Sequence, residues 1–498
     1  MSPPADTLHG DACYLALKAR DARFDGRFFT GVTSTGIYCR PVCRVRTPRR
    51  ENCRFFPHAA QAESAGFRPC LRCRPELAPQ SVIWSIQDAT SILAMQAARL
   101  LDEPEAWRGE LPSADALAKR LGVSARHVRR IFEAQFGVSP LQYLQTRRLL
   151  TAKQLLADTD LPITQIALAS GYSSVRRFNA AFSQHYKLNP TQLRRDGRAA
   201  AAGPGVRLGY RPPYDVDAML AFFRTRQIAG VDDVGDRRFA RTLVIESGRR
   251  KHKGWIEVVF DEARHHALLR TSETLREVLP LVIRRVRAAL DLDADPEPVN
   301  AVLHPSFPRG DALRVPGAFS GYELAVRAVL GQQITVAAAR TLAQRLVDHF
   351  GESIETPFDN VNRLFPEASV LAKAEGDALG QLGIVRQRQA AIVAIAQGVA
   401  QGRLHLHGGA DVAQTIEQLK LLPGIGDWTA QYIAMRALRW PDAFPSGDVA
   451  LHKALRVQGA PNPARAAEAA SQQWKPWRSY AVIRAWASLN DTSPGASQ

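Results

Sequence analysis

Four cysteines near the start of the sequence constrain its folding more than any other feature. Cys39 and Cys43 form a C-x3-C pair, and after a gap of 26 residues Cys70 and Cys73 form a C-x2-C pair. Two close thiolate pairs separated by a loop of this size can bind one zinc ion in tetrahedral geometry. The chain has only six cysteines in 498 residues, so chance would rarely pair four of them in this way. The spacing predicts a zinc module, and on spacing alone a purely structural zinc site remains the alternative to a reactive one.

The length and composition indicate a multidomain protein without a membrane span. The 498 residues are enough for three or four domains, and the apolar fraction of 46% is ordinary for globular protein. The sequence lacks the long uncharged apolar window of a membrane helix, and its start lacks a signal-peptide pattern. Sparse cysteine together with a thiolate metal site predicts a reducing, cytoplasmic location and no membrane partner.

The positive charge is concentrated in the first part of the chain. Residues 1–200 contain 29 Lys and Arg against 17 Asp and Glu, a net charge of +12 out of +17 for the whole chain. Arginines, Arg44 among them, crowd the cysteine segment. This distribution favours double-stranded DNA as a partner, and charge that serves only solubility is the alternative.

Residues 112–195 contain one pattern twice. In each copy a short helical run is followed by a glycine, Gly122 or Gly171, and then by a serine, Ser124 or Ser174, that can cap a second helix. The two glycines are 49 residues apart, which leaves room for a connecting helix at about residues 141–157. The pattern predicts two helix-turn-helix units joined by that helix.

The second half begins after a Gly- and Ala-rich stretch, 196–206, that is typical of a linker. Residues 207–295 mix helical periodicity with strand-like runs, at 243–245, 255–260 and, more weakly, 266–270. From residue 319 to residue 489 helical patterns follow one another. The second half therefore predicts a small α+β domain followed by a helical domain.

Within this helical region the run Leu422–Ala430 contains the sequence L-P-G-I-G. Pro423 ends one helix, and Gly424 and Gly426 let the backbone turn so that bare N–H groups face a phosphate at the start of the next helix. Such a hairpin binds the DNA backbone without distinguishing its sequence. An aspartate, Asp448, follows 22 residues after Gly426.

The segments that hold the cysteine pairs, Thr35–Arg44 and Gly66–Cys73, resemble the N-terminal zinc domain of the Ada methylation-response regulators. The resemblance implies that Cys39 accepts a methyl group irreversibly from a methyl phosphotriester in DNA. The chemistry is physically sound, because zinc keeps a thiol deprotonated at neutral pH and a thiolate can displace a methyl group. Methylation would lower the negative charge of the cluster by one and tighten DNA binding, which turns damage into a signal.

The repeated motif resembles the two-motif DNA-binding domain of AraC-type activators. The resemblance implies that the second helix of each unit enters the major groove and that the protein contacts RNA polymerase at promoters. The candidates for DNA contact are Arg126, Arg129 and Arg130 in the first unit and Arg176 and Arg177 in the second. A helical bundle that binds nothing is the alternative, and the duplication and the basic second helices argue against it.

The hairpin followed by an aspartate resembles the helix-hairpin-helix superfamily of DNA glycosylases, and segments 210–215, 326–333 and 474–481 extend the resemblance to the AlkA-type 3-methyladenine glycosylases. It implies that Asp448 is the catalytic carboxylate. The resemblance assigns the base pocket to Trp428, Tyr432, Trp486 and Phe222, and the DNA contacts to Gly424, Gly426, Thr429 and Gln333, the last as the residue that enters the duplex.

The substrate of such an enzyme suggests the mechanism. A purine alkylated at N3 or N7 is cationic and leaves readily, so aromatic faces that hold the cation and one carboxylate that steadies the sugar would suffice. No lysine adjoins Asp448, because Lys453 comes a helical turn later, so we expect a monofunctional glycosylase without lyase activity. A monovalent cation bound by the hairpin main chain is compatible with this pattern.

The same residues allow plainer assignments. Asp448 is also placed to cap a helix beginning at Val449, and the two roles can coexist. Trp440, Trp474 and Trp477 are assigned to the core. Gln333 is polar where the AlkA pattern has an apolar wedge, so its assignment stays open.

The sequence thus predicts a multidomain, mainly α protein with α+β parts. Its expected domains are a zinc-bound α/β module at 8–80, an AraC-type double helix-turn-helix at 84–196, an AlkA-type α+β domain at 206–295 and an all-helical glycosylase domain at 296–490. The predicted function is that of a bifunctional alkylation-response protein, a transcriptional regulator fused to a 3-methyladenine-type glycosylase with one zinc ion. A regulator whose second half binds DNA but is catalytically inactive is one rival, and a glycosylase whose first half only localises it is another.

Overall fold

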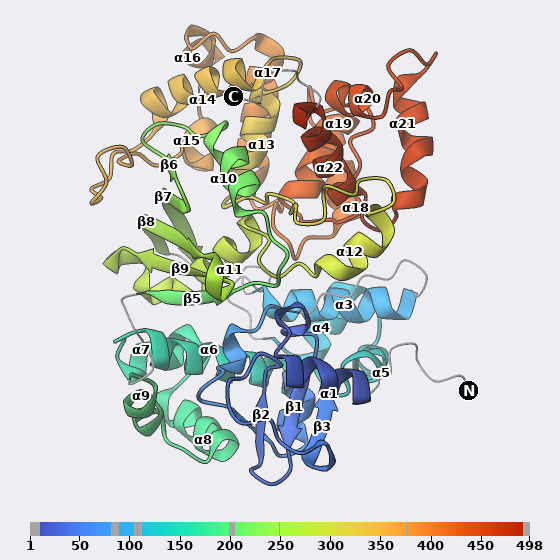
Figure 1. The fold of residues 1–498 in the computed structure, drawn as a ribbon. Coiled ribbons are helices and arrows are strands. Elements are labelled where there is room, and N and C mark those ends of the chain that lie inside the picture. The colour runs from blue at the N-terminus through green and yellow to red at the C-terminus, as the bar shows by residue number, and fades with distance from the viewer. Residues whose placement is uncertain are drawn as a thin grey trace.

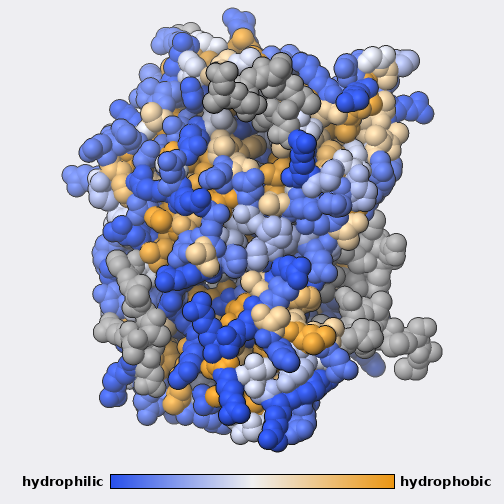
Figure 2. Space-filling view, in the orientation of Figure 1, coloured by the Kyte–Doolittle hydropathy of each residue, from blue (hydrophilic) through white to orange (hydrophobic). Residues whose placement is uncertain are grey.

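The computed structural model describes residues 10–80, 89–103, 107, 112–198, 205–248, 250–374 and 376–491. In Figure 1 the first two hundred residues form one half of the molecule, and the rest form the other half stacked on it. None of the helices in these ranges combines the length and the apolar character that crossing a lipid bilayer requires. On the face shown in Figure 2 hydrophilic residues predominate, and hydrophobic ones form scattered patches.

The zinc module is a four-stranded sheet of order β3-β1-β2-β4 with two helices. Its elements are α1 (Gly10–Ala19), β1 (Phe29–Val32), β2 (Ile37–Cys39), β3 (Cys53–Phe56), α2 (Ala59–Ser64) and β4 (Arg68–Pro69). Gly36, at φ 65°, closes the tight turn between β1 and β2, a conformation that favours glycine. β2 and β4 pair in parallel, with Tyr38 opposite Pro69. This register places the next residue of each segment, Cys39 at the end of β2 and Cys70 just after β4, next to each other.

The two predicted helix-turn-helix units are present, and the connecting helix between them is confirmed. The helices are α3 (Ala89–Asp102), α4 (Ala114–Leu121), α5 (Ala125–Phe136), α6 (Pro140–Asp158), α7 (Ile163–Ala169), α8 (Val175–Tyr186) and α9 (Pro190–Arg198). The side chain of Ser124 accepts from the N–H of His127 at the start of α5, and Ser174 caps α8 in the same way. Gly122 and Gly171 both have positive φ.

The α+β part of the second half is built on a five-stranded antiparallel sheet of order β5-β9-β8-β7-β6. Its elements are β5 (Val206–Gly209), α10 (Val216–Arg224), β6 (Asp232–Gly235), β7 (Arg238–Ser247), β8 (Arg250–Asp261), β9 (His266–Thr271) and α11 (Leu279–Ala289). The three predicted strands are confirmed, and the pair β7–β8 is longer than the strand-like runs indicated. β8 buries mainly alternate residues, 254, 256, 258 and 260, whereas β7 is buried on both faces over residues 239–243.

The remaining chain is helical, as predicted. Its helices are α12 (Pro296–Leu303), α13 (Gly321–Leu330), α14 (Val336–Phe350), α15 (Ala368–Leu371), α16 (Gly376–Gln381), α17 (Arg386–Ala400), α18 (Val412–Lys420), α19 (Asp427–Arg436), α20 (Val449–Ala454), α21 (Pro463–Ser471) and α22 (Arg478–Asp491). Trp474 and Trp477 are buried and Trp440 packs against the same cluster, which confirms their assignment to the core.

The two halves meet in a seam that combines apolar and polar contacts. One hydrophobic cluster includes Leu149 and Phe178 from the first half and Leu208 and Leu243 from the second. At its edge the fully buried guanidinium of Arg211 donates to carbonyl oxygens of both halves, those of Asp25, Pro79, Gln80, Asp293 and Ala294. The predicted linker 196–206 includes 199–204, which lie outside the described residues, and the parts on either side of it share a core.

Candidate functional sites: a cysteine cluster and a carboxylate cleft

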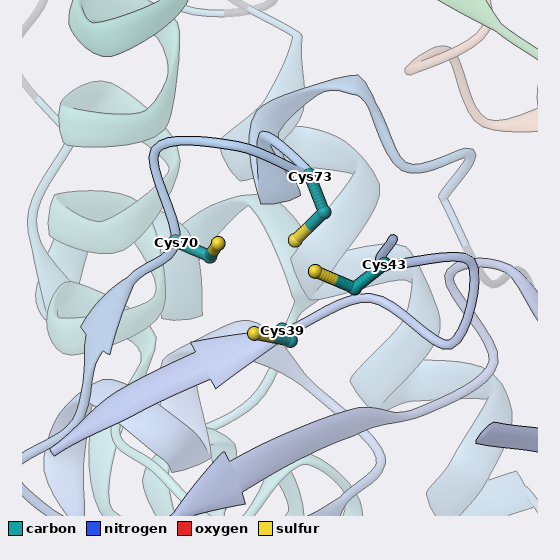
Figure 3. Close-up of side chains that lie close together, drawn as sticks. All are labelled: Cys39, Cys43, Cys70 and Cys73. Carbon is teal, nitrogen blue, oxygen red and sulfur yellow. The ribbon is translucent and has the colours of Figure 1, made fainter. Parts of the chain in front are cut away.

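The four predicted metal ligands converge at one end of the small sheet. Cys39 ends β2, Cys43 follows in the next turn, and Cys70 and Cys73 come directly after β4. Figure 3 shows the four side chains turned toward one point, and their sulfur atoms all lie within 4.8 Å of one another. Sulfur atoms around a tetrahedral zinc ion lie about 3.8 Å apart, since each Zn–S bond is about 2.3 Å. The cluster therefore has the donor set and the size for zinc.

The burial of the cluster also favours a cation. Cys39, Cys43 and Cys70 are at most 6% exposed, and burial raises the pKa of the Cys73 thiol well above its ordinary value. Four thiolates packed together in a poorly solvated site need a positive ion to offset their charge. Zinc supplies that charge and keeps the ligands deprotonated.

Arg40 links the cluster to the rest of the zinc module. Its N–H lies 3.3 Å from the sulfur of Cys73, and its guanidinium donates to the Cys73 carbonyl at 2.9 Å and to the Asp25 carboxylate at 2.8 Å. Exposure does not distinguish Cys39 from Cys70, because both are 6% exposed, and Cys73 is the most accessible of the four. The role of Cys39 as methyl acceptor stays a prediction that depends on the matching flanking sequence.

The basic residues predicted to contact DNA lie on the surface of the first half. Arg44 is exposed beside the cysteine cluster. Arg126, Arg129 and Arg130 are exposed on α5, as are Arg176 and Arg177 on α8. The opposite faces of both helices are buried, through Val128, Ile131, Phe132, Phe178 and Phe182. Each second helix thus presents arginines to the solvent and an apolar face to its own domain.

Asp448 stands at the start of α20, and its carboxylate has three N–H donors. Oδ1 accepts from the backbone of Leu451 at 2.7 Å, so the predicted helix-capping role is confirmed. The indole Nε1 of Trp486 donates to the same oxygen at 3.1 Å, and that of Trp428 donates to Oδ2 at 2.9 Å. The carboxylate is held rigidly by neutral donors, and Oδ2 retains one acceptor position.

The predicted aromatic residues surround this carboxylate. The rings of Trp428 and Tyr432 stack, with centroids 5.3 Å apart and planes within 10°, and Tyr432 lies 6.4 Å from Trp486. A cleft of about 1680 Å³ is lined by these residues, by Asp448 and by Phe222. α10, α19, α20 and α22 each contribute to it, so the cleft exists only in the folded second half.

The hairpin between α18 and α19 forms one rim of the same cleft. Gly424 has φ 73°, and Gly426 begins α19 with open space around it, which leaves the first N–H groups of the helix free for an anion. The side chain of Gln332 donates to the Gly424 carbonyl and to the Thr429 hydroxyl, both at 2.9 Å. Thr429 is only 2% exposed, so its predicted contact with DNA stays a prediction that this burial does not support. Gln333 is exposed in the α13–α14 turn, at φ 54°.

Two arginines that the sequence did not predict contact the aromatic residues of the cleft. The guanidinium carbon of Arg226 lies 3.7 Å from the ring centroid of Phe222, and that of Arg436 lies 4.7 Å from it. Arg436 also donates to the Tyr432 hydroxyl at 2.6 Å. Each arginine follows an aromatic partner by four residues, Arg436 within α19 and Arg226 in the turn after α10, and this spacing is a signal that could have indicated both contacts.

These arginines alter the electrostatics expected for the base pocket. Burial by itself raises the pKa of the Tyr432 hydroxyl, but Arg436 and Arg226 outweigh it and hold that pKa below its ordinary value. Burial lowers the pKa of Arg226 to about 10, which leaves it protonated at neutral pH. The pocket therefore is not a set of bare aromatic faces, because protonated guanidinium groups already cover part of them.

Four family profiles match successive parts of the chain. They are the metal binding domain of Ada at residues 12–76, a helix-turn-helix domain at 117–196, the AlkA N-terminal domain at 205–320 and the HhH-GPD superfamily of base excision DNA repair proteins at 326–479. Together they account for both sites and for the two DNA-binding motifs.

Known relatives match either the whole chain or one of its halves. A Mycobacterium tuberculosis protein named probable bifunctional transcriptional activator/DNA repair enzyme AlkA is 35% identical over 497 residues, which cover 97% of each chain. The Escherichia coli DNA-3-methyladenine glycosylase 2 is 33% identical over 279 residues, 56% of this chain and 95% of its own. The E. coli bifunctional activator and repair enzyme Ada is 33% identical over 198 residues, 40% of this chain and 52% of its own.

The fold of the second half agrees with these matches. The solved 3-methyladenine DNA glycosylase of Archaeoglobus fulgidus aligns with 58% of this chain and 99% of its own, with a TM-score of 0.50 and 20% identity. The match over 97% of the chain carries both halves in the same order. The chain therefore belongs to the family of bifunctional Ada/AlkA-type proteins, in which a transcriptional activator is joined to a DNA repair glycosylase.

Proposed function

We propose that this protein senses alkylated DNA through Cys39 and excises alkylated purines, of the 3-methyladenine type, through Asp448. The observation that supports excision most directly is the Asp448 carboxylate, fixed by Trp428 and Trp486 inside a cleft that the hairpin borders. Capping of α20 accounts for the bond from Leu451, but it does not account for the two indole N–H groups that also donate to this carboxylate. The alternative function, a regulator whose second half is catalytically inactive, is less consistent with this arrangement.

Excision requires Asp448 to act on the sugar. When the C1′–N bond breaks, its electron pair goes to the base and positive charge develops on the sugar. The fixed carboxylate stabilises that charge, and a water oxygen then bonds to C1′ and releases a proton. Lys420 also lines the cleft, but it lies 3.3 Å from Glu417 and is 40% exposed, so we propose water as the nucleophile and a monofunctional reaction.

Sensing requires the Cys39 thiolate to attack the methyl carbon of a phosphotriester. A C–S bond forms, the C–O bond breaks, and its electron pair restores the negative charge of the phosphate. Zinc bound by the four cysteines would keep Cys39 deprotonated for this step. The cluster becomes less negative by one charge, so repulsion between the zinc module and the DNA backbone falls.

The proposal for the activator half concerns its binding to DNA, its contact with RNA polymerase and its cellular location. We propose that α5 and α8 enter adjacent major grooves, that the bound protein contacts RNA polymerase, and that it works in the cytoplasm. The exposed arginines of both helices support the first point, and the thiolate cluster, which needs a reducing compartment, supports the last. A monovalent cation at the hairpin main chain belongs to the same proposal.

One assay tests both activities. The protein is incubated with alkylated DNA that carries labelled methyl groups, and free purine and protein-bound label are measured separately. Asp448→Asn should abolish release of free purine only, and Cys39→Ser should abolish protein-bound label only. If the unaltered protein gives neither signal, the enzymatic proposal is wrong.

A further inference from the structure

The floor of the cleft holds a buried set of charges that cancel. Arg241 lies 3.2 Å from Asp232 and 2.6 Å from Glu323. Arg327 lies 2.9 Å from Glu323 and 3.5 Å from Asp232. Two guanidinium groups face two carboxylates, so this set contributes no net charge to the space above it.

Arg226 and Arg436 stand above that floor and have neutral acceptors. Among the described residues, Arg226 donates to the Phe222 carbonyl at 3.2 Å and to the Thr225 hydroxyl at 3.0 Å. The acceptors of Arg436 are the carbonyls of Pro316 and Gly317, at 2.7 and 3.0 Å, and the Tyr432 hydroxyl at 2.6 Å. Neither guanidinium group forms an ion pair within the described residues, and Glu323 acts on Arg436 only at longer range, so both groups add positive charge to the side of the cleft that Phe222 and Tyr432 line.

Charge is thus separated across the cleft. Asp448 provides the negative end, and its three donors are uncharged N–H groups. The stacked rings of Trp428 and Tyr432 lie between it and Arg436. The separation matches the reaction, because breaking the bond leaves positive charge on the sugar and sends electrons to the base.

Tyr432 connects the arginines to the space where a base would lie. Its oxygen accepts from Arg436, and it also interacts with the Arg226 side chain. A phenol whose oxygen is occupied by guanidinium donors still has its own proton to donate, directed away from them. Hydrogen bonds polarised by a charged donor in a poorly solvated site are stronger than those in water.

We propose that Arg226 and Arg436, acting through the Tyr432 hydroxyl, stabilise the electron density that reaches the base as its bond to the sugar breaks. A cationic base becomes neutral in this step, and the proton released by the attacking water goes to solvent. A neutral base leaves as an anion and takes up that proton. The inference deepens the proposed excision and rests on it, and it makes both arginines positioning residues for the leaving group.

The two kinds of base should respond differently to loss of this charge. A cationic base is repelled by the guanidinium groups when it is bound, so these groups raise KM. The repulsion is relieved as the base becomes neutral, so the same groups also raise kcat. A neutral base gains nothing on binding but gains as negative charge develops, so they raise kcat alone. A purely structural role for Arg226 would change both substrates by the same factor.

The test uses the full-length protein and two duplexes that differ in one nucleotide, 7-methylguanine as the cationic base and hypoxanthine as the neutral one. Arg226→Gln should lower kcat/KM for hypoxanthine about tenfold, while for 7-methylguanine KM falls and kcat/KM stays constant or rises. Arg226→Lys keeps the charge and should keep most of the original ratio. Arg264→Gln is the matched control, because the Arg264 side chain is 72% exposed and its ion pair, with Asp261 at 3.2 Å, lies on the surface.

Tyr432→Phe tests whether the arginines act through the Tyr432 hydroxyl or directly on the base. In that background Arg226→Gln should cause little further loss on hypoxanthine, since the hydroxyl that transmits the charge is gone. Equal losses on both duplexes, a lysine variant as defective as the glutamine variant, or no measurable hypoxanthine release by the unaltered protein would overturn the inference. Release of neither base by the unaltered protein would overturn the proposed excision itself, and the inference with it.

Discussion

The cysteine cluster and the carboxylate cleft are built in opposite ways. The cluster takes its four ligands from a stretch of 35 residues, and one parallel strand pairing brings them together. The cleft takes residues from α10 to α22, more than 260 positions apart, and needs the packing of the whole second half. The cluster is therefore a property of local sequence, whereas the cleft is a property of tertiary structure.

The two sites also manage charge differently. The cluster concentrates negative sulfur ligands that one cation offsets, and methylation of one ligand changes that balance. The cleft keeps its carboxylate apart from its guanidinium groups, with stacked aromatic rings between them. A single substitution should therefore disable either site without disabling the other, and this independence can be measured.

The largest effect is expected for Asp448→Asn. The amide removes the charge that steadies the sugar, so the excision rate should fall about 100-fold or more, measured as free base released in single-turnover assays. An amide also retains an oxygen that can cap α20, so the unfolding temperature should change little. Methyl transfer to Cys39 should be unchanged. If methyl transfer were lost together with excision, the two sites would not be independent.

Removal of one metal ligand tests the other site. Cys70→Ala should reduce bound zinc from one equivalent to nearly none, measured by metal analysis of the purified protein, and should abolish methyl transfer. Cys53→Ala is the matched control, because Cys53 is as buried as Cys70 and lies outside the cluster. Excision should stay within about threefold of the original rate, since no cysteine lines the cleft. A larger loss would mean that the cleft depends on the zinc module.

The same contrast explains what sequence alone could predict. The zinc ligands, the helix caps at Ser124 and Ser174 and the connecting helix α6 depend on spacings of a few residues, and the structure has all of them. Asp448, Trp428 and Trp486 could be brought together only by family resemblance, because nothing local places α20 against α22. Arg226 and Arg436 were not predicted, since arginines are ordinarily solvated; their spacing from Phe222 and Tyr432 is only a weak signal, and tertiary packing is what leaves Arg436 5% exposed and places Arg226 against Phe222.

The seam was beyond sequence reasoning for a similar reason. Arg211 belongs to a segment that was noted only for its family match, and its five carbonyl acceptors come from three separate stretches of chain. A Gly- and Ala-rich linker suggests independent halves, yet Leu149 and Leu208 share one core. Composition can locate a linker, but it cannot tell whether the flanking surfaces pack together.

Arg211→Met tests whether the two halves of the molecule unfold together. The substitution keeps an apolar stem but leaves five buried carbonyls without their donor, so the free energy of unfolding should fall by about 3 kcal/mol. Scanning calorimetry should show one transition for the original protein and two for the variant, one for each half. Arg264→Gln, on the surface, should leave the single transition in place. Two transitions in the original protein would contradict a cooperative seam.

The smallest effect concerns Glu63, which joins the zinc module to the helix-turn-helix domain. Its carboxylate accepts from the Tyr38 hydroxyl at 3.0 Å and from the Thr146 hydroxyl at 2.7 Å, and burial raises its pKa to about 7. Lys153 and His185 also face it. The folded state thus holds a proton that the unfolded chain releases near pH 4.5, so stability should fall as the pH rises from about 4.5 to 7 and then level off.

Glu63→Gln removes this titration, because its amide oxygen can accept from one of the two hydroxyl groups and its NH2 group can donate to the oxygen of the other. Urea unfolding between pH 4.5 and 8 should show a loss of stability on the order of 2 kcal/mol in the original protein and a flatter profile in the variant. The two profiles should converge at the acidic end, where Glu63 is neutral like glutamine. Parallel profiles would mean that Glu63 does not titrate at this interface. Because the seam joins the two halves, this loss of stability should reach the cleft as well, whereas only the sulfur site lies next to the titrating group, through Tyr38, which precedes Cys39.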